Sequence, residues 1–211
     1  DAISVTSIGG NQFSANVHAG WDIRGYANGG YLLALVGTTM RQAAQGRDPV
    51  TITAHYLAPV AAGQVGITTE IVKFGRQLTT VMATIQQGGR DAIRAIGAFG
   101  KVPAPTDGLF HVVGESPELP DFEDCPRHGS GDMGFAIAIR DQVDVRLHPD
   151  DSGFERRQPS GTAVIRGWFS FPDNRPIDVL AMLLATDAFP PAVFNLELTP
   201  GWVPTIELTV H

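Results

Sequence analysis

Residues 175–191 read RPIDVLAMLLATDAFPP, a nearly uninterrupted apolar stretch with proline near both ends. The pattern predicts one helix over these residues. Pro176 suits a first helical turn, Asp178 complements the positive end of the helix dipole, and Pro190-Pro191 cannot continue the helix. Because such a helix is apolar on nearly every side, other parts of the chain have to cover it.

Asp187 is the one ionisable group late in this stretch, among Leu184, Ala185, Ala188 and Phe189. A carboxylate in apolar surroundings must find hydrogen-bond donors or have its pKa raised. Both situations are typical of catalytic acids and bases. A residue just before Pro190 could instead be an ordinary turn or cap residue, so the residue alone leaves both interpretations open.

A second apolar helix is expected in the first half of the chain. Asn28 stands at an N-cap position, Gly29-Gly30 follow, and the apolar run 31–45 is closed by Gly46. Phe13, Ala15 and Val17 alternate with polar residues as in a short strand. Four further strands are predicted over residues 50–57, 64–74, 78–87 and 92–102. Together they predict a curved antiparallel sheet folded round the helix.

The second half repeats this order after a linker. Residues 103–134 are rich in proline and polar residues, which indicates a surface linker, and the single cysteine, Cys125, lies within it. Strands are predicted over residues 135–139, 142–148, 162–171 and 204–211. Residues 206–211 align with 50–55, each a strand that follows an apolar helix, which indicates a duplicated unit. Because nothing follows His211, we expect that the second unit lacks its C-terminal strands in this chain.

Composition excludes several classes of protein. The 211 residues carry a formal net charge of −7 and are 43% hydrophobic, as in an ordinary globular protein. The acidic balance argues against nucleic acid as a partner. We find no membrane span and no signal peptide, and one cysteine excludes an internal disulfide, so we expect a cytoplasmic protein. The six histidines show no ligand spacing, so no metal is expected.

Several segments together resemble a known family. These are Gly29 to Leu35 at a helix start, the β-rich first half, the Pro-rich linker, residues 185–189, and residues 204–208 at the start of a strand. They resemble the double-hotdog acyl-CoA thioesterases of the TesB-like group. The resemblance implies an α+β fold of two hotdog modules, each an antiparallel sheet wrapped round a long apolar helix. The expected boundaries are 1–102 for the first module, 103–134 for the linker and 135–211 for the second.

The resemblance also implies catalytic residues. The family hydrolyses acyl-CoA thioesters with an Asp, a Thr or Ser, and a Gln from the second module. Asp187 falls on the Asp position and Thr205 on the Thr position. The Gln position belongs to a late strand that this chain does not contain.

The chemistry is consistent with that assignment. Asp187 could hold and deprotonate a water, with the Thr205 hydroxyl positioning it. A backbone N–H at Gly29 or Gly30 could bind the substrate carbonyl or a phosphate, although glycine pairs more often serve close packing. None of these groups requires a metal or an organic cofactor. The partner implied is acyl-CoA, of a chain length that the sequence does not define.

Two other functions remain open at this stage. A hotdog protein that binds acyl-CoA or acyl-carrier protein without turnover would keep the slot but lack a complete site. A hotdog dehydratase is the weaker option, because its site usually pairs a histidine with a helix carboxylate and neither apolar helix contains a histidine. Hotdog sheets often associate at their edges, so we expect a homo-oligomer, with a dimer as the simplest form.

Overall fold

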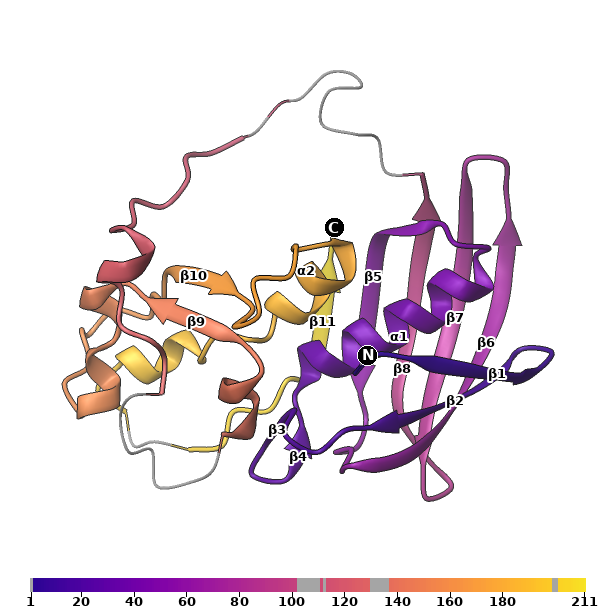
Figure 1. The fold of residues 1–211 in the computed structure, drawn as a ribbon, viewed down its shortest axis with the longest axis horizontal. Coiled ribbons are helices and arrows are strands. Elements are labelled where there is room, and N and C mark those ends of the chain that lie inside the picture. Colours follow the sequence, from indigo (N-terminus) through magenta and orange to yellow (C-terminus); the bar gives the residue numbers. More distant parts are fainter. Residues whose placement is uncertain (1, 102–110, 112, 130–136, 199–200) are drawn as a thin grey trace.

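The computed structural model describes residues 2–101, 111, 113–129, 137–198 and 201–211 (Figure 1). Its main feature is a seven-stranded antiparallel sheet in the order β1-β2-β6-β7-β8-β5-β11. Its strands are β1 (Val5–Gly9), β2 (Gln12–Val17), β5 (Asp48–Tyr56), β6 (Gly63–Phe74), β7 (Leu78–Gln87), β8 (Arg90–Gly100) and β11 (Glu207–Val210). The remaining strands form two small two-stranded sheets. One pairs β3 (Asp22–Ile23) with β4 (Tyr26–Ala27), and the other pairs β9 (Asp144–Leu147) with β10 (Gly167–Ser170).

Helix α1 (Gly29–Ala43) lies across one face of this sheet (Figure 1). The Asn28 side chain caps it by accepting a hydrogen bond from the Tyr31 N–H at 3.0 Å. After its last turn, Gly46 takes a positive φ of 82°, which glycine adopts at little cost. Leu33 and Leu35 are fully buried, and each such side chain contributes about 2 kcal/mol relative to exposure. The predicted first helix is confirmed.

The strands of the first half are also confirmed. On β2, Phe13, Ala15 and Val17 are all buried, as the alternation predicts. Strands β5 to β8 fall where the sequence places them, with small differences at their ends. They form a continuous antiparallel meander from β6 through β7 to β8, and β5 then pairs with β8 on its other side. Helix α1 contacts β5, β6 and β7, which places the core between helix and sheet.

The long helix predicted over residues 175–191 is wrong. Helix α2 covers only Val179–Ala185, because Asp178 has an extended backbone and its side chain caps the helix by accepting from the Ala181 N–H at 2.8 Å. The helix then ends before it can include Asp187. Met182 on α2 is 56% exposed, so the helix is not covered on every side.

Other expectations for the second half need correction. Of the strand predicted over 135–139, residues 135 and 136 lie outside the described residues, and Ala138–Asp141 is a 3-10 turn. Strands β9 and β10 are each only four residues long and pair with each other, and β9 also forms an isolated bridge from Arg146 to Arg127. Further 3-10 turns cover Phe122–Asp124, Pro149–Asp151, Gly153–Arg156 and Ala192–Asn195. Cys125, expected in a surface linker, is buried at 2% exposure.

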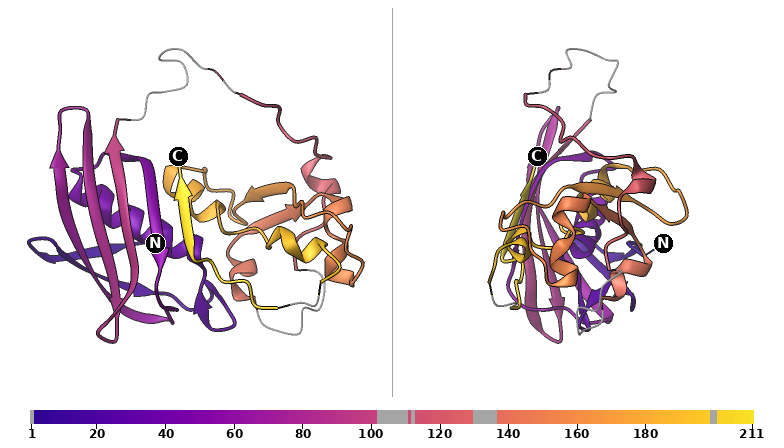
Figure 2. Two further views of the ribbon diagram at one scale, coloured as in Figure 1. Left: turned by 180° about the vertical axis from the view of Figure 1, so that it is seen from behind. Right: turned by 90° about the vertical axis from the view of Figure 1, so that its left-hand side faces the viewer.

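Strand β11 joins the second half of the chain to the main sheet. It pairs antiparallel with β5, with Thr209 opposite Thr53 and Glu207 opposite His55. The hydroxyls of Thr53 and Thr209 are hydrogen-bonded at 3.0 Å. The view from behind shows β11 beside β5 at this edge of the sheet (Figure 2). Helices α1 and α2 also pack against each other, so sheet and helices both connect the two halves.

Candidate active site

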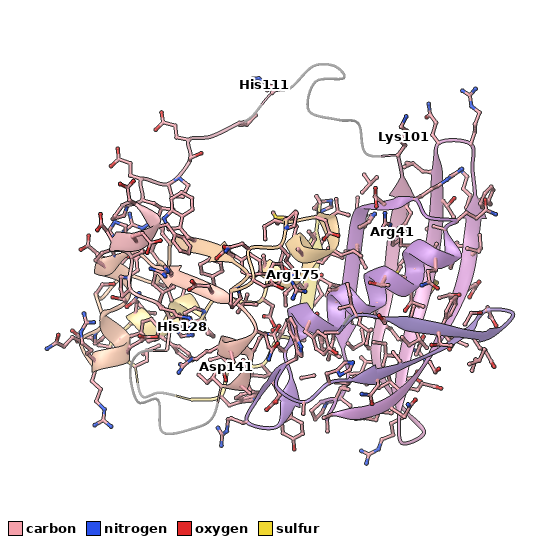
Figure 3. The ribbon with its side chains drawn as sticks, in the orientation of Figure 1. Arg41, Lys101, His111, His128, Asp141 and Arg175 are labelled. Atoms are coloured by element: carbon pink, nitrogen blue, oxygen red, sulfur yellow. The ribbon has the colours of Figure 1, made fainter. Side chains whose placement is uncertain are left out.

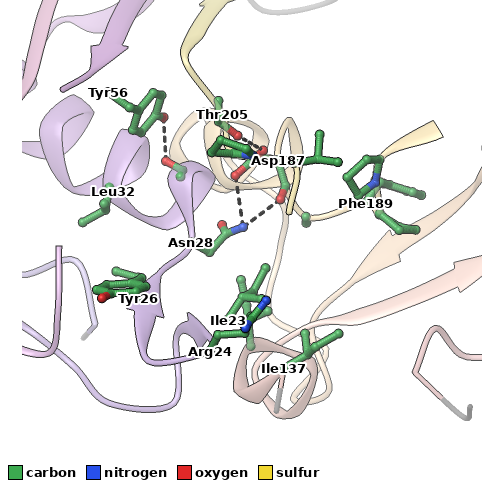
Figure 4. Close-up of a pocket in the computed structure, with 18 of the residues that line it drawn as sticks. Ile23, Arg24, Tyr26, Asn28, Leu32, Tyr56, Ile137, Asp187, Phe189 and Thr205 are labelled. Carbon is green, nitrogen blue, oxygen red and sulfur yellow. Dashed lines mark hydrogen bonds between the residues drawn. The ribbon is translucent and has the colours of Figure 1, made fainter. Parts of the chain in front are cut away.

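Asp187 lies just beyond the end of α2, where it meets the start of α1 (Figure 4). The Thr205 hydroxyl donates to its Oδ1 at 2.8 Å. Its Oδ2 accepts from the Asn28 amide at 3.1 Å and from the Gly30 N–H at 3.2 Å. The same Asn28 amide donates to the backbone oxygen of Asp187 at 2.8 Å. The start of α1 and the segment that contains Thr205 thus both donate to one carboxylate.

Glycine makes this convergence possible. A Cβ on Gly30 would lie 2.3 Å from the backbone oxygen of Leu184 and 3.1 Å from Cβ of Asp187. A Cβ on Gly29 would lie 2.7 Å from Oδ2 of Asp187. Side chains at these two positions would push the start of α1 away from the end of α2. The glycine pair therefore lets the backbone donors of the helix start reach Asp187, in addition to allowing close helix packing.

The electrostatic balance around Asp187 favours a basic carboxylate. Burial raises its pKa above the usual aspartate range, and the hydrogen bonds from Thr205, Gly30 and Gly29 offset only part of that effect. Tyr56 lies nearby and donates its hydroxyl to the Gly29 carbonyl at 2.7 Å. Burial, followed by the charge of Asp187, raises the pKa of Tyr56, so this phenol stays protonated. The site thus holds one carboxylate surrounded by donors.

A cavity of about 980 Å³ opens beside Asp187. Its wall includes Asp187, Thr205, Gly29, Asn28 and Tyr56. Most of the remaining lining is apolar and comes from both halves of the chain, including Leu32, Val60, Ile139, Val143, Phe189 and Phe194. Figure 4 shows Tyr26, Ile23 and Ile137 on the side of Asn28 away from Thr205. An apolar cavity with a few convergent polar groups is the usual form of a small-molecule site.

The structure therefore places all four sequence-predicted residues, Asp187, Thr205, Gly29 and Gly30, at one location. Sequence reasoning assigned Asn28 only a capping role and did not single out Tyr56. Asn28 directly precedes the glycine pair, and its side chain caps the helix start that Asp187 approaches. Its position beside Gly29 and Gly30 therefore could have indicated a role in the site. Nothing in the sequence around Tyr56 indicated its contact with Gly29.

The described residues also bear on metal binding and on membrane crossing. Among them, no three His, Cys, Asp or Glu side chains are grouped so that they could hold a metal ion. Within the same residues, neither helix has the length and apolar character needed to cross a bilayer.

Comparison with known families now identifies the class. Residues 17–100 match the model of the acyl-CoA thioesterase N-terminal domain, and residues 122–211 match that of the acyl-CoA thioesterase C-terminal domain. The chain belongs to the acyl-CoA thioesterase family. Among curated relatives it is similar to the thioesterase-like protein TwmA of Talaromyces wortmannii, with 24% identity over 95% of this chain. It spans 65% of the length of TwmA.

Solved structures agree on the fold. A candidate thioesterase II from Thermobifida fusca matches with a TM-score of 0.87 and 26% identity, over 99% of this chain and 77% of that one. A hotdog-fold protein of unknown function from Alicyclobacillus acidocaldarius matches with a TM-score of 0.82 and 24% identity, over 99% of this chain and 75% of that one. The fold of this chain is therefore of the hotdog type.

Proposed function

We propose that this protein hydrolyses acyl-CoA thioesters and that Asp187 activates the water. The observation that carries the proposal is the position of the Asp187 carboxylate in the wall of a largely apolar cavity of about 980 Å³. Oδ2 already accepts from Asn28 and Gly30, whereas Thr205 is the only described donor within hydrogen-bond distance of Oδ1. Oδ1 thus keeps a lone pair for a water molecule beside a bound thioester.

The reaction follows from this arrangement. Asp187 takes a proton from the water as the water oxygen attacks the thioester carbon and forms a tetrahedral intermediate. The intermediate then collapses, the carbon–sulfur bond breaks, and the proton passes from Asp187 to the sulfur of CoA. The products are a free acid and CoA. The raised pKa of Asp187 supports this role, because a more basic carboxylate takes the proton of water more readily.

The other site residues have positioning roles in this proposal. The Thr205 hydroxyl fixes the rotation of the carboxylate, and Gly30 and Asn28 fix its other oxygen. The positive end of the α1 dipole lies at Asp187 and favours both the carboxylate and negative charge developing on the substrate. Gly29 lines the cavity, and we assign it to the part of the wall that contacts the thioester.

We also propose the double-hotdog arrangement, with a first module at 1–102, a linker at 103–134 and a second module at 135–211. The pairing of β11 with β5 and the packing of α2 against α1 support it. Both kinds of contact place the second helix and its following strand beside their counterparts in the first half. The site then lies between the modules.

The test is hydrolysis of acyl-CoAs from short to long chains, followed by the release of free CoA. We expect Asp187→Asn to lower kcat by about a hundredfold to ten-thousandfold, as loss of a general base does. Asp178→Asn is the matched control, because Asn also caps helices and Asp178 does not line the cavity. Thr205→Val should lower kcat by about tenfold or more through loss of one bond to a charged group.

Retained turnover in Asp187→Asn would overturn the proposed mechanism. Absence of turnover in the unmodified protein, together with saturable binding of acyl-CoA, would instead assign the protein to the binding class.

A further inference from the structure

Tyr56 has no role in the mechanism proposed above, but it lines the cavity and contacts both segments that donate to Asp187. It is the last residue of β5, and its hydroxyl donates to the Gly29 carbonyl at 2.7 Å (Figure 4). Its backbone N–H donates to the Ile206 carbonyl at 2.9 Å, one residue after Thr205. Tyr56 therefore holds the start of α1 with its side chain and the approach to β11 with its backbone.

The bond from the Tyr56 hydroxyl reaches the same peptide unit that contacts Asp187. Gly29 supplies the carbonyl of this unit and Gly30 supplies its N–H, which donates to Oδ2 of Asp187 at 3.2 Å. A trans peptide is planar and its C=O and N–H point in opposite directions, so a donor on the oxygen also fixes the direction of the N–H. The two bonds thus form a chain that runs from Tyr56 through one peptide unit to the carboxylate.

The start of α1 needs such support because it begins with two glycines. Glycine loses more backbone freedom on ordering than any other residue, so Gly29-Gly30 is a weak first turn for a helix. A larger residue would not fit at Gly29, since a Cβ there would lie 2.7 Å from Oδ2 of Asp187. The same Cβ would lie 3.3 Å from Cε1 and Cζ of Tyr56, which shows how closely the ring packs against this glycine.

The Tyr56 hydroxyl is committed to this contact and is not a donor for the substrate. A phenol has one proton, and here that proton goes to the Gly29 carbonyl. Burial and then the charge of Asp187 raise the pKa of Tyr56, so the hydroxyl remains a donor. The ring is partly buried against the core, and Figure 3 shows the side chains that fill the region where the start of α1 meets the second half of the chain. Tyr56 can therefore act on the chemistry only through the helix start.

We propose that Tyr56 is a positioning residue for Asp187, whose hydroxyl holds the peptide between Gly29 and Gly30 so that its N–H stabilises the ionised carboxylate. The proposal rests on the thioesterase function proposed above and adds one residue to its machinery. Hydrogen bonds in a chain polarise one another, so donation into the carbonyl also makes the N–H of the same peptide a stronger donor. Loss of the Tyr56 hydroxyl weakens the bond to Asp187 and favours the protonated form of the carboxyl group.

The test is Tyr56→Phe, which removes the hydroxyl and keeps the ring in the cavity wall. We expect kcat for an acyl-CoA to fall by about threefold at high pH, where the carboxylate is ionised in both proteins, and by about tenfold on the acid side of the pH profile. KM should change by less than about twofold, because the ring still fills its place. A loss of kcat that is equal at every pH would overturn the proposal.

Tyr31→Phe is the matched control. The Tyr31 hydroxyl also donates to a backbone carbonyl, that of Ala2 at 2.9 Å, but Tyr31 does not line the cavity. The substitution therefore removes the same kind of hydrogen bond away from Asp187. We expect kcat and the pH profile of Tyr31→Phe to match those of the unmodified protein.

A second measurement separates this proposal from the proposed function. The Asp187 carboxyl group is titrated by NMR with isotope-labelled aspartate, which needs no turnover, and Asp187→Asn identifies its signal. We expect it to titrate at higher pH in Tyr56→Phe than in the unmodified protein or in Tyr31→Phe. That result supports the positioning role even if the protein does not hydrolyse acyl-CoA. The same titration in all three proteins overturns it.

Discussion

Helices α1 and α2 begin with the same kind of cap but carry different residues further along. Asn28 caps α1 and Asp178 caps α2, each accepting from a backbone N–H three residues ahead. Gly37 follows the cap of α1 by nine residues. Asp187 follows the cap of α2 by the same nine residues, just beyond the end of that helix. Asp187 accepts hydrogen bonds from two segments, the start of α1 and the residues before β11, whereas Gly37 is buried within α1 against Leu183.

The length of the two helices explains the difference. Helix α1 continues to Ala43, so Gly37 stays inside a regular helix whose backbone groups are already paired. Helix α2 stops at Ala185, and the following turn carries Asp187 to the donors at the start of α1. One end of the helix pair is thus closely packed, and the other holds the carboxylate to which we assign the catalysis. Substitutions at each end should separate these roles.

The largest effect on stability should come from placing an aspartate at Gly37, where the two helices are closely packed. A Cβ on Gly37 would lie 2.6 Å from Cδ1 of Leu183, so Gly37→Asp would bury a charge without donors and force the helices apart. We expect a loss of at least about 3 kcal/mol in the free energy of unfolding, measured by urea denaturation. Gln42→Asp, exposed on the same helix, should cost less than about 1 kcal/mol. Equal stability of the two variants would contradict this view of Gly37.

A smaller effect is expected from Gly30→Ala at the other end. Its added Cβ would lie 2.3 Å from the Leu184 carbonyl, and moving α1 away would also lengthen the bond from Gly30 to Asp187. We expect a loss of about 1–3 kcal/mol together with reduced turnover at temperatures where the variant remains folded. Gly66→Ala on β6, where a Cβ meets nothing within 4 Å, is the control and should change neither property. Normal turnover in Gly30→Ala would show that this close contact is not needed.

The smallest effect concerns pH. Because burial raises the pKa of Asp187, turnover should rise with pH through a pKa above the usual aspartate range and fall about tenfold per pH unit below it. The native state binds this proton more tightly than the unfolded chain does. Stability contributed by Asp187 is therefore present at low pH and lost as pH rises from the usual aspartate pKa through the raised one.

Asp187→Asn should consequently leave the Tm at neutral pH unchanged or higher, although it removes activity. Thermal unfolding of Asp187→Asn and Asp178→Asn at acidic and neutral pH checks this sign. A marked drop in Tm at neutral pH for Asp187→Asn alone would show that the ionised carboxylate stabilises the fold instead.

The sequence was sufficient for the first half of the chain because local signals agreed there. Asn28 and Gly46 mark the ends of α1, and the alternation of Phe13, Ala15 and Val17 marks β2. In the second half, apolar composition was misleading. The apolar character of residues such as Ile177 and Phe189 predicts one continuous helix, but a capping aspartate at 178 starts the helix later and the helix ends at Ala185. A side-chain cap outweighs apolar character at a helix boundary.

The residues of the candidate site also differ in how far the sequence alone predicts their contacts. Thr205 and Asp187 are 18 residues apart in the chain, so only the family pattern, and no local signal, indicates that they meet. The Asn28 amide and the Tyr56 hydroxyl reach the site through tertiary packing alone.

The threonine pair at the junction of β5 and β11 relates the two halves in a further way. Thr209 aligns with Thr53 in sequence, and it is also the residue opposite Thr53 across the sheet. The residue before Thr53 pairs with the one after Thr209, so a local half-turn exchanges the two strands. Separate subunits could make the same self-complementary contact, but only at sufficient concentration. Within one chain the two strands face each other at a high effective concentration, so the junction does not weaken on dilution.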